Sequence, residues 1–371
     1  MKLAIVCDDL IQKGGAEKIV EAFSDIFPDA PVYTTIASDE WLKKMESKNR
    51  IVRTSFLQKF PFSVKLNRFY APFLLHILAI ESFDLSEFDV VLSSSSRFAH
   101  FALTKPSTKH ISYVHSPGRM FWEPFDYFEK ESFGVFSFIK KVALGFLKLP
   151  LMYIRMKDYE ASQKVDVFLT NSMTSQKRIK KYYGRDSEIV YPFVDFEKLK
   201  FTESADKSAK RDFYLIITRL AAWKKVDIAV KAFNDLGIEL RIIGDGPDLN
   251  RLKKMAKQNI KFLGYASDSE KIENIKNCRA VIVTQKEDFG IVPLESMACG
   301  KPVIAFGEGG ATEIVIEDKT GEFFYEQRPE SLINIINNFN PDKYITSDCI
   351  ERARFFNKEK FELEIKRIIN V

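Results

Sequence analysis

Short apolar runs alternate with longer stretches of helical period along the whole chain. In the first half, the apolar runs are residues 3–7, 31–35, 90–93, 110–114 and 167–170. Buried parallel strands form nearly continuous apolar runs, and the helices between them repeat every 3.6 residues. The pattern therefore predicts β-α-β units and a first domain built on a parallel sheet.

The same alternation restarts after a polar stretch at 202–211. The strands expected there are 213–218, 240–243, 261–263, 280–284 and 302–305, and the helices are 226–235, 248–257, 271–277 and 292–299. The polar stretch is typical of a connector, so we expect one domain over 1–200 and another over 201–371. Two Rossmann-like units of similar size predict a ligand site between them, at the carboxyl ends of the strands.

The last segment, 357–369, spaces Phe361, Ile365 and Ile368 at helical intervals. This spacing predicts an amphipathic helix, which either completes the second domain or packs back on the first. The most apolar stretch, 135–154, is interrupted by lysines and Pro150, so no membrane-spanning helix is predicted.

Composition narrows the class of protein. The 56 Lys and Arg against 51 Asp and Glu give a net charge of +5, which does not favour nucleic-acid binding. Four cysteines stand far apart and fit neither a disulfide framework nor a zinc site. The chain also opens without a signal-peptide pattern, so we expect it in the cytoplasm.

Two acids separated by seven residues frame the turn after the expected strand 280–284. Gly290 permits a tight turn and Pro293 suits a first helical turn, so Glu287 is expected on a loop and Glu295 in a helix. The amides exposed at that helix start are those of Phe289, Gly290 and Ile291. Such amides bind phosphate, and carboxylates hold the hydroxyls of a sugar and a ribose. The alternative is a pair of solvated acids beside an ordinary turn.

Two cations follow the expected strand 213–218. Arg219 offers a planar fork and Lys224 a mobile point charge, which together suit a diphosphate. Cations at a helix N-terminus oppose the helix dipole unless an anion joins them, which favours this reading over a solvated basic helix start.

These motifs resemble glycosyltransferase family 4. Its E-x7-E motif matches Glu287 and Glu295, and its G-R-L-x-x-x-K-G motif matches Arg219 and Lys224, with other residues in place of both glycines. Residues 14–17, 113–117, 243–247 and 309–310 also match, so the resemblance covers most of the chain in order.

The resemblance implies an α/β fold of the GT-B type, with two Rossmann-like parallel-sheet domains facing each other across a cleft. It implies that Glu287 and His115 act on the reacting sugar. Arg119, four residues after His115, is expected to bind an acceptor phosphate, and a surface salt bridge is the alternative. The donor-binding residues that it implies are Arg219, Lys224, Glu295, Phe289, Gly290, Ile291, Val292, Gly15 and Gly244. The other three histidines, His76, His100 and His110, are expected to be structural, and an ordinary tight turn is the alternative for the glycines at 14–15.

A narrower resemblance, at 114–122, 180–185 and 287–295, is to mannosyltransferases of bacterial O-antigen and related surface glycans. It implies a retaining transfer of mannose from GDP-mannose to a lipid-linked or membrane-associated glycan. No D-x-D sequence occurs, so neither a metal nor another cofactor is expected. The alternatives are a UDP-sugar transferase of the same family, a sugar-nucleotide 2-epimerase and a non-catalytic sugar-nucleotide-binding subunit.

The stretch 133–157 is rich in Phe, Lys and Arg and contains no acid. This composition is typical of a basic amphipathic element that touches anionic lipid, although a packed helix with a solvated face also fits. Lys140, Lys141 and Lys148 lie within it. We therefore expect a protein that binds peripherally at the inner face of the cell membrane.

Overall fold

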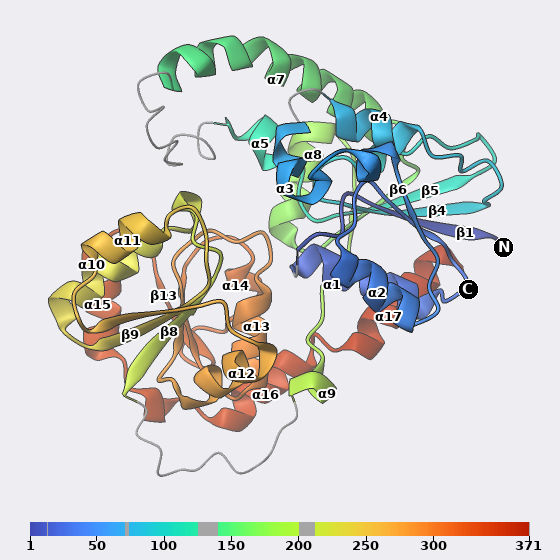
Figure 1. The fold of residues 1–371 in the computed structure, drawn as a ribbon. Coiled ribbons are helices and arrows are strands. Elements are labelled where there is room, and N and C mark those ends of the chain that lie inside the picture. The colour runs from blue at the N-terminus through green and yellow to red at the C-terminus, as the bar shows by residue number, and fades with distance from the viewer. Residues whose placement is uncertain (13, 71–73, 125–139, 200–211, 371) are drawn as a thin grey trace. The chain divides into compact units, whose positions relative to one another are not determined.

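The computed structural model describes residues 1–12, 14–70, 74–124, 140–199 and 212–370. Their contacts form two compact units, each built on its own parallel sheet (Figure 1). Unit 1 contains the described residues up to 191 and those from 362 onward, and unit 2 contains those between 192 and 361. The change of unit falls between Tyr191 and Pro192, whereas the sequence analysis placed it at 200.

Unit 1 has a seven-stranded sheet in the order β3-β2-β1-β4-β5-β6-β7, and all described pairs are parallel. The strands are β1 (Leu3–Cys7), β2 (Val32–Thr34), β3 (Val52–Thr54), β4 (Val90–Ser95), β5 (Lys109–Val114), β6 (Val167–Thr170) and β7 (Glu188–Ile189). The five predicted strands are confirmed. The two edge strands, β3 and β7, were not predicted because they are short and partly exposed.

Helices cover both faces of this sheet. They are α1 (Gly15–Ile26), α2 (Asp39–Ser47), α3 (Ser63–Tyr70), α4 (Leu75–Glu81), α5 (Arg119–Trp122), α7 (Lys140–Ser162) and α8 (Met173–Tyr183), with 3-10 turns η1 (Phe56–Lys59) and η3 (Ala99–Phe101). Ala4 and Val6 of β1 share one core with Ile80 of α4 and Ile154 of α7. None of the helices in the described ranges is long and apolar enough to cross a membrane.

Unit 2 has a six-stranded parallel sheet in the order β10-β9-β8-β11-β12-β13. Its strands are β8 (Phe213–Ile217), β9 (Glu239–Ile243), β10 (Ile260–Gly264), β11 (Val281–Val283), β12 (Val303–Phe306) and β13 (Gly321–Phe324). The first five were predicted and the edge strand β13 was not. Counted from the first strand of each unit, both sheets begin 3-2-1-4-5-6, the order of doubly wound nucleotide-binding folds.

The helices of unit 2 pack on both faces of its sheet (Figure 1). They are α9 (Phe196–Leu199), α10 (Val226–Leu236), α11 (Leu249–Met255), α12 (Asp268–Asn277), α13 (Ile291–Ala298), α14 (Ala311–Ile314), α15 (Pro329–Asn338) and α16 (Thr346–Arg354), with 3-10 turns η5 (Ala222–Lys224) and η6 (Pro341–Lys343). Helices α10, α11 and α15 share the main buried cluster with the sheet.

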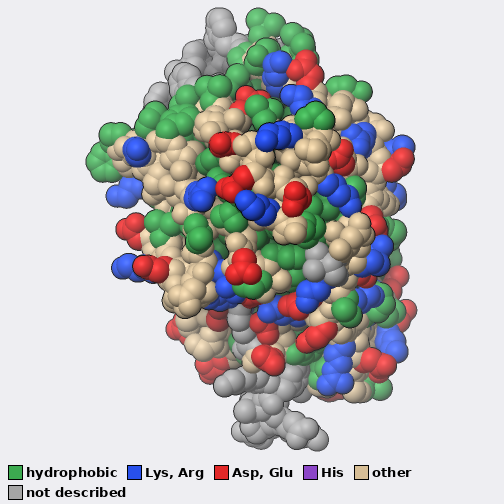
Figure 2. Space-filling view, turned by 90° about the vertical axis from the view of Figure 1, so that its right-hand side faces the viewer, with side chains coloured by type: hydrophobic (Ala, Val, Ile, Leu, Met, Phe, Trp, Pro, Cys, Tyr) green, Lys and Arg blue, Asp and Glu red, His purple; other side chains and the backbone are tan. Residues whose placement is uncertain are grey.

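The final helix, α17 (Lys358–Ile369), begins in unit 2 and ends in unit 1. Lys109 Nζ of β5 donates to the carbonyl oxygen of Ile368 at 3.2 Å, and Arg367 pairs with Glu188 of β7. The predicted C-terminal amphipathic helix is thus present, and its last residues pack on the first unit. Over the face drawn in Figure 2, basic and acidic side chains are interspersed rather than separated.

Candidate functional site

The turn that carries Glu287 follows β11 and leads into α13. Gly290 has a φ of +102°, a left-handed conformation that disfavours residues with a Cβ, and directly precedes the first residue of α13. Glu287 therefore lies on the loop and Glu295 lies within the helix, as the spacing predicted.

Lys224 and Glu287 are in direct contact. Lys224 Nζ lies 2.7 Å from Glu287 Oε1, and the two side chains are only 12% and 20% exposed. The hydroxyl of Thr284, beyond β11, donates to the Lys224 carbonyl oxygen at 2.8 Å, and the Lys224 ammonium lies 4.1 Å from the Trp223 ring centroid. Neighbouring strands β8 and β11 thus bring together two charged groups that were expected to bind different parts of the donor, the diphosphate and the sugar.

Glycines allow two backbone segments to approach these residues closely. The Gly310 amide donates to the Glu287 carbonyl oxygen at 2.8 Å, and a Cβ at Gly310 would lie 2.3 Å from Phe289 Cα. Gly244, with a φ of +138°, lies so close to Thr218 that a Cβ would be 1.9 Å from the Thr218 carbonyl oxygen. Gly310 therefore supports the Glu287 loop, and Gly244 supports the segment that carries the half-buried Arg219.

Lys225 takes a backbone conformation that usually requires glycine. Its φ is +54° at the residue preceding α10. The family motif has a glycine at this position, so the structure gives the physical reason for that glycine. A lysine in this conformation costs about 1–2 kcal/mol of backbone strain.

Glu295 is 5% exposed and pairs with a residue that the sequence analysis did not single out. Lys271 Nζ of α12 lies 3.2 Å from Glu295 Oε1 and 3.4 Å from Asp268 Oδ1. Burial opposes the charging of Lys271, but the two carboxylates outweigh it, so its pKa is raised. No sequence signal links α12 to the E-x7-E motif.

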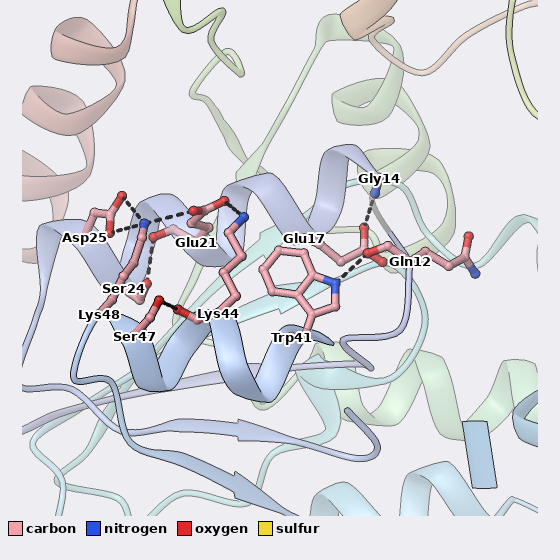
Figure 3. Close-up of polar contacts among 10 residues, drawn as sticks. All are labelled: Gln12, Gly14, Glu17, Glu21, Ser24, Asp25, Trp41, Lys44, Ser47 and Lys48. Atoms are coloured by element: carbon pink, nitrogen blue, oxygen red, sulfur yellow. Dashed lines mark hydrogen bonds and ion pairs between the residues drawn. The ribbon is translucent and has the colours of Figure 1, made fainter. Parts of the chain in front are cut away.

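In unit 1, the start of α1 already carries its own carboxylate. The Gly14 amide donates to Glu17 Oε2 at 3.1 Å, as Figure 3 shows. Burial raises the pKa of Glu17 to about 7, and Asp9 adds to the rise, while the hydrogen bond from Gly14 and the charge of Arg97 oppose it. Gly15, for which we predicted a role in donor binding, therefore lies at a helix start where the Gly14 amide already donates to Glu17.

Two aspartates tie the carboxyl end of β1 to the turn after β4. The Asp8 carboxylate accepts hydrogen bonds of 2.7–2.9 Å from four successive backbone amides, those of Ser96, Arg97, Phe98 and Ala99. Asp9 pairs with the Arg97 guanidinium and accepts from Asn67 Nδ2 at 2.9 Å. The sequence analysis missed both aspartates, because their partners are 58 or more residues away in the chain.

His115 directly follows β5 and is partly buried. Its Nε2 lies 2.9 Å from the Ser94 hydroxyl oxygen, and Ser175 donates to its carbonyl oxygen at 2.7 Å. Burial lowers the pKa of His115 to about 4, so the ring is neutral at pH 7.

The other three histidines are buried, as expected for structural residues. Burial lowers the pKa of His110 to about 3 and also lowers that of His76. His100 Nε2 lies 3.0 Å from Asp158 Oδ1, and Asp158 also accepts from the Trp122 indole at 2.6 Å. These contacts join α7 to α5 and η3.

Arg119 is on α5, four residues after His115 in the chain. Its Nε lies 3.4 Å from Glu123 Oε2, and the same carboxylate accepts from Arg178 Nε at 3.0 Å and from the Tyr182 hydroxyl at 3.1 Å. Arg119 therefore belongs to a charged network in which two guanidinium groups share one carboxylate.

Residues 197–356 match the family model described as glycosyl transferases group 1. An uncharacterized glycosyltransferase of Methanocaldococcus jannaschii, MJ1178, is 29% identical over 196 residues, which cover 50% of this chain and 52% of the relative. Human alpha-1,3/1,6-mannosyltransferase ALG2 is 28% identical over 316 residues, which cover 75% of this chain and 71% of the relative. Over residues 197–356 the chain therefore resembles glycosyl transferases of group 1, and it is similar to ALG2 over three quarters of its length. It spans about half the length of most curated relatives that it matches.

Solved structures share the fold over the whole chain. Anabaena Alr3699/HepE in complex with UDP and glucose has a TM-score of 0.73 at 18% identity, covering 100% of this chain and 99% of that one. The lipopolysaccharide outer core galactosyltransferase WaaB has a TM-score of 0.64 at 18% identity, covering 100% and 99%. The predicted GT-B fold is confirmed, with two Rossmann-like sheets of seven and six strands.

Proposed function

We propose that this protein is a glycosyltransferase that transfers mannose from GDP-mannose, with retention of anomeric configuration and without a metal, to a lipid-linked or membrane-associated glycan. The observation that carries the proposal is the Lys224–Glu287 pair beside the start of α13. The choice of mannose is supported by the match to human ALG2, a mannosyltransferase that aligns with 75% of this chain.

The donor diphosphate would be bound by unit 2. Arg219 and Lys224 supply two positive charges beyond β8, and the amides of Phe289, Gly290, Ile291 and Val292 lie at the start of α13. Amides at a helix start and nearby cations stabilise phosphate charge. Gly244 would serve this site by supporting the backbone next to Arg219.

The carboxylates would hold the neutral parts of the donor. Glu287, already bonded to Lys224 and Gln285, would accept from sugar hydroxyls, and the buried Glu295 would accept from ribose hydroxyls. A carboxylate that a charged neighbour holds in place is a strong hydrogen-bond acceptor. Loss of Glu287 would therefore remove sugar recognition rather than diphosphate binding.

In the transfer itself, the bond between the sugar C1 and the diphosphate oxygen breaks and the acceptor oxygen bonds to C1 on the same face. The acceptor proton moves to the departing diphosphate. The chain's share is to position the reactants and to stabilise charge on the leaving group, with Arg219, Lys224 and the α13 amides in place of a metal. His115 would contact the reacting sugar or the acceptor, Arg119 would bind an acceptor phosphate, and the backbone at Gly15 would bind the donor.

An anionic membrane surface is proposed as the partner of unit 1. Five apolar side chains on α7 recur at helical spacing and are 45–71% exposed: Leu149, Met152, Tyr153, Met156 and Tyr159. Arg155 and Lys157 lie among them in the sequence. Such a helix binds at a lipid interface, where apolar side chains enter the headgroup region and cations meet anionic lipid. Lys140, Lys141 and Lys148 and the aromatics at 133–138 lie outside the described side chains.

The test is a thermal-shift screen with GDP, UDP and ADP and their sugars, followed by a transfer assay with a lipid-linked glycan. GDP-mannose at 100 times its dissociation constant should raise the free energy of unfolding by about 2.7 kcal/mol. A larger shift with a UDP sugar would instead assign the UDP-sugar transferase. Glu287→Gln should abolish transfer, whereas the control Glu308→Gln, which breaks an exposed pair with Lys286, should leave it intact.

The same assay separates the other readings. An epimerase would convert the free nucleotide sugar without an acceptor, and a non-catalytic subunit would bind the donor without turnover. If none of the nucleotides or nucleotide sugars changed the melting temperature of the protein, the proposed function as a whole would be contradicted.

A further inference from the structure

Three consecutive serines at the end of β4 each contact a different histidine. The pairs are Ser93 Oγ with His110 Nε2 at 2.9 Å, Ser94 Oγ with His115 Nε2 at 2.9 Å, and Ser95 Oγ with His100 Nδ1 at 2.8 Å. All three serines are buried, at 0–3% exposure. Because the three histidines lie 5, 17 and 21 residues after their serines, with no common spacing, the serine run in the sequence does not reveal this pattern.

Only the middle pair includes a histidine that is not buried. His110 and His100 are 0% and 2% exposed. His115 lies at the carboxyl end of the sheet, just after β5, and is partly exposed. Among the described residues, its Nδ1 makes no hydrogen bond, whereas its Nε2 faces Ser94. Of the two ring nitrogens, Nδ1 is therefore the one that can meet a ligand.

The hydroxyl of Ser94 determines which nitrogen carries the proton. Within the described part of the chain, His115 Nε2 is its hydrogen-bond partner. If Nε2 carried the proton and donated to Ser94, the buried hydroxyl would be left without an acceptor, which is unfavourable. Ser94 therefore donates to Nε2, and the neutral ring carries its proton on Nδ1.

We infer that Ser94 is a positioning residue that holds His115 as the Nδ1–H tautomer, so that His115 donates a hydrogen bond to the reacting sugar or the acceptor. The inference rests on the proposed function, which places His115 at the reacting groups. A donor at this position cannot also remove the acceptor proton. It stabilises an oxygen that gains negative charge, and the proton of the acceptor is left to the departing diphosphate.

The tautomer can be read directly by ¹⁵N NMR on the full chain labelled at histidine. The chain has four histidines, so the signals are few enough to assign by single substitutions. We expect a protonated Nδ1 and an unprotonated Nε2 for His115 at pH 7, and a change in both shifts in Ser94→Ala. A protonated Nε2 in the unsubstituted protein would overturn the inference.

Kinetics give a second test with a matched control. Ser94→Ala should lower kcat about tenfold while KM for the donor changes less than twofold, since loss of a hydrogen bond that orients a side chain has about this effect. Ser93→Ala removes the same kind of bond from the buried His110 and should leave kcat unchanged. Equal kcat values in the two variants would overturn the inference. If the unsubstituted chain transfers no sugar, the proposed function fails, and the NMR result alone decides the tautomer.

Discussion

The ammonium of Lys224 and the carboxylate of Glu287 form a 2.7 Å ion pair, although 63 residues separate them in the chain. Each group therefore neutralises the other before any ligand is bound. A diphosphate entering this site would compete with Glu287 for Lys224, and a sugar hydroxyl would compete with Lys224 for Glu287. Under the proposed function, the pair would thus couple the binding of the diphosphate to the binding of the sugar.

Substituting Lys224 and Glu287 one at a time should distinguish diphosphate binding from sugar binding. Lys224→Met should weaken binding of both GDP and GDP-mannose by tenfold or more, since a charge-assisted bond is worth about 1.5–3 kcal/mol. Glu287→Gln should keep or strengthen GDP binding, because Lys224 loses its internal competitor, and should remove the preference for GDP-mannose over GDP. Isothermal titration calorimetry measures both constants. Equal losses of GDP affinity in both variants would contradict this division of roles.

Gly310→Ala should disturb the Glu287 loop. The new Cβ would lie 2.3 Å from Phe289 Cα, so the loop must move. We expect a loss of about 1–3 kcal/mol in the free energy of unfolding and at least a tenfold drop in kcat/KM. Gly237→Ala is the control: Gly237 has a φ of +70° and nothing within 4 Å of a Cβ, so it should cost about 1–2 kcal/mol without affecting turnover. Similar kinetics in both variants would refute the proposed support of the loop.

Lys225→Gly should stabilise the protein. Its φ of +54° is strained for lysine, and glycine removes this strain, so the free energy of unfolding should rise by about 1 kcal/mol. Lys231→Gly, at an exposed position inside α10, should instead lower it by about 1 kcal/mol. Urea unfolding measures whether the free energy of unfolding rises in Lys225→Gly and falls in Lys231→Gly.

Two glutamates on α1 should give opposite pH dependences. Burial raises the pKa of Glu17 to about 7 from 4.5, so the folded state binds this proton more tightly than the unfolded state. Its contribution to stability is complete below pH 4.5 and is lost as the pH rises through 7, by about 3 kcal/mol. Glu17→Gln should remove this decline, as measured by urea unfolding between pH 4.5 and 8.

Glu21 is the matched control on the same helix (Figure 3). Burial would raise its pKa, but Lys44 at 2.7 Å and Lys48 at 2.8 Å outweigh burial and lower it to about 2. Its contribution is present above pH 4.5 and is lost as the pH falls through 2. Glu21→Gln should therefore destabilise the protein at pH 7 and leave the decline between pH 4.5 and 7 in place. If Glu21→Gln removed the decline in stability between pH 4.5 and 7, the decline would not be due to Glu17.

The exposed face of α7 should carry membrane binding. Met152 and Met156 are 49% and 51% exposed, and burying a methionine at a lipid interface is worth about 1.5–3 kcal/mol. Replacing both with glutamate should weaken binding to vesicles containing anionic lipid by tenfold or more in a sedimentation assay. Met173→Glu, an equally exposed methionine on α8, should have no effect. Binding that survives substitution of Lys140, Lys141 and Lys148 would show that the basic residues are not part of the face.

Sequence periodicity was sufficient to predict the strands that build the centres of both sheets. The central strands β1, β8 and β11 are buried and therefore form continuous apolar runs in the sequence. Strands β4 and β5 are also buried, and their apolar residues are mixed with serines and a histidine. Edge strands such as β7, with only two residues, carry no such signal. Pro150 interrupts an apolar segment in the sequence, yet α7 continues through it with the loss of one backbone hydrogen bond. Leu151, Ile154 and Ala161, which follow the proline, pack against the core.

Local sequence motifs predicted the backbone positions of the candidate site residues but not their side-chain contacts. The loop position of Glu287 and the helical position of Glu295 follow from Gly290 and Pro293 alone. The contacts of Glu287 with Lys224, of Glu295 with Lys271 and of His115 with Ser94 could not be predicted in this way. They depend on strand pairing and helix packing between different elements of the chain.

The division of the chain also has a consequence for folding during synthesis. Residues 192–361 form one continuous segment of unit 2, whereas unit 1 receives its last helical turns from residues beyond 361. On the ribosome, unit 2 can therefore complete its sheet as soon as its segment has emerged, while unit 1 waits until the residues beyond 361 have also emerged before α17 can dock on β5 and β7. The first unit to be translated is thus the last to be finished.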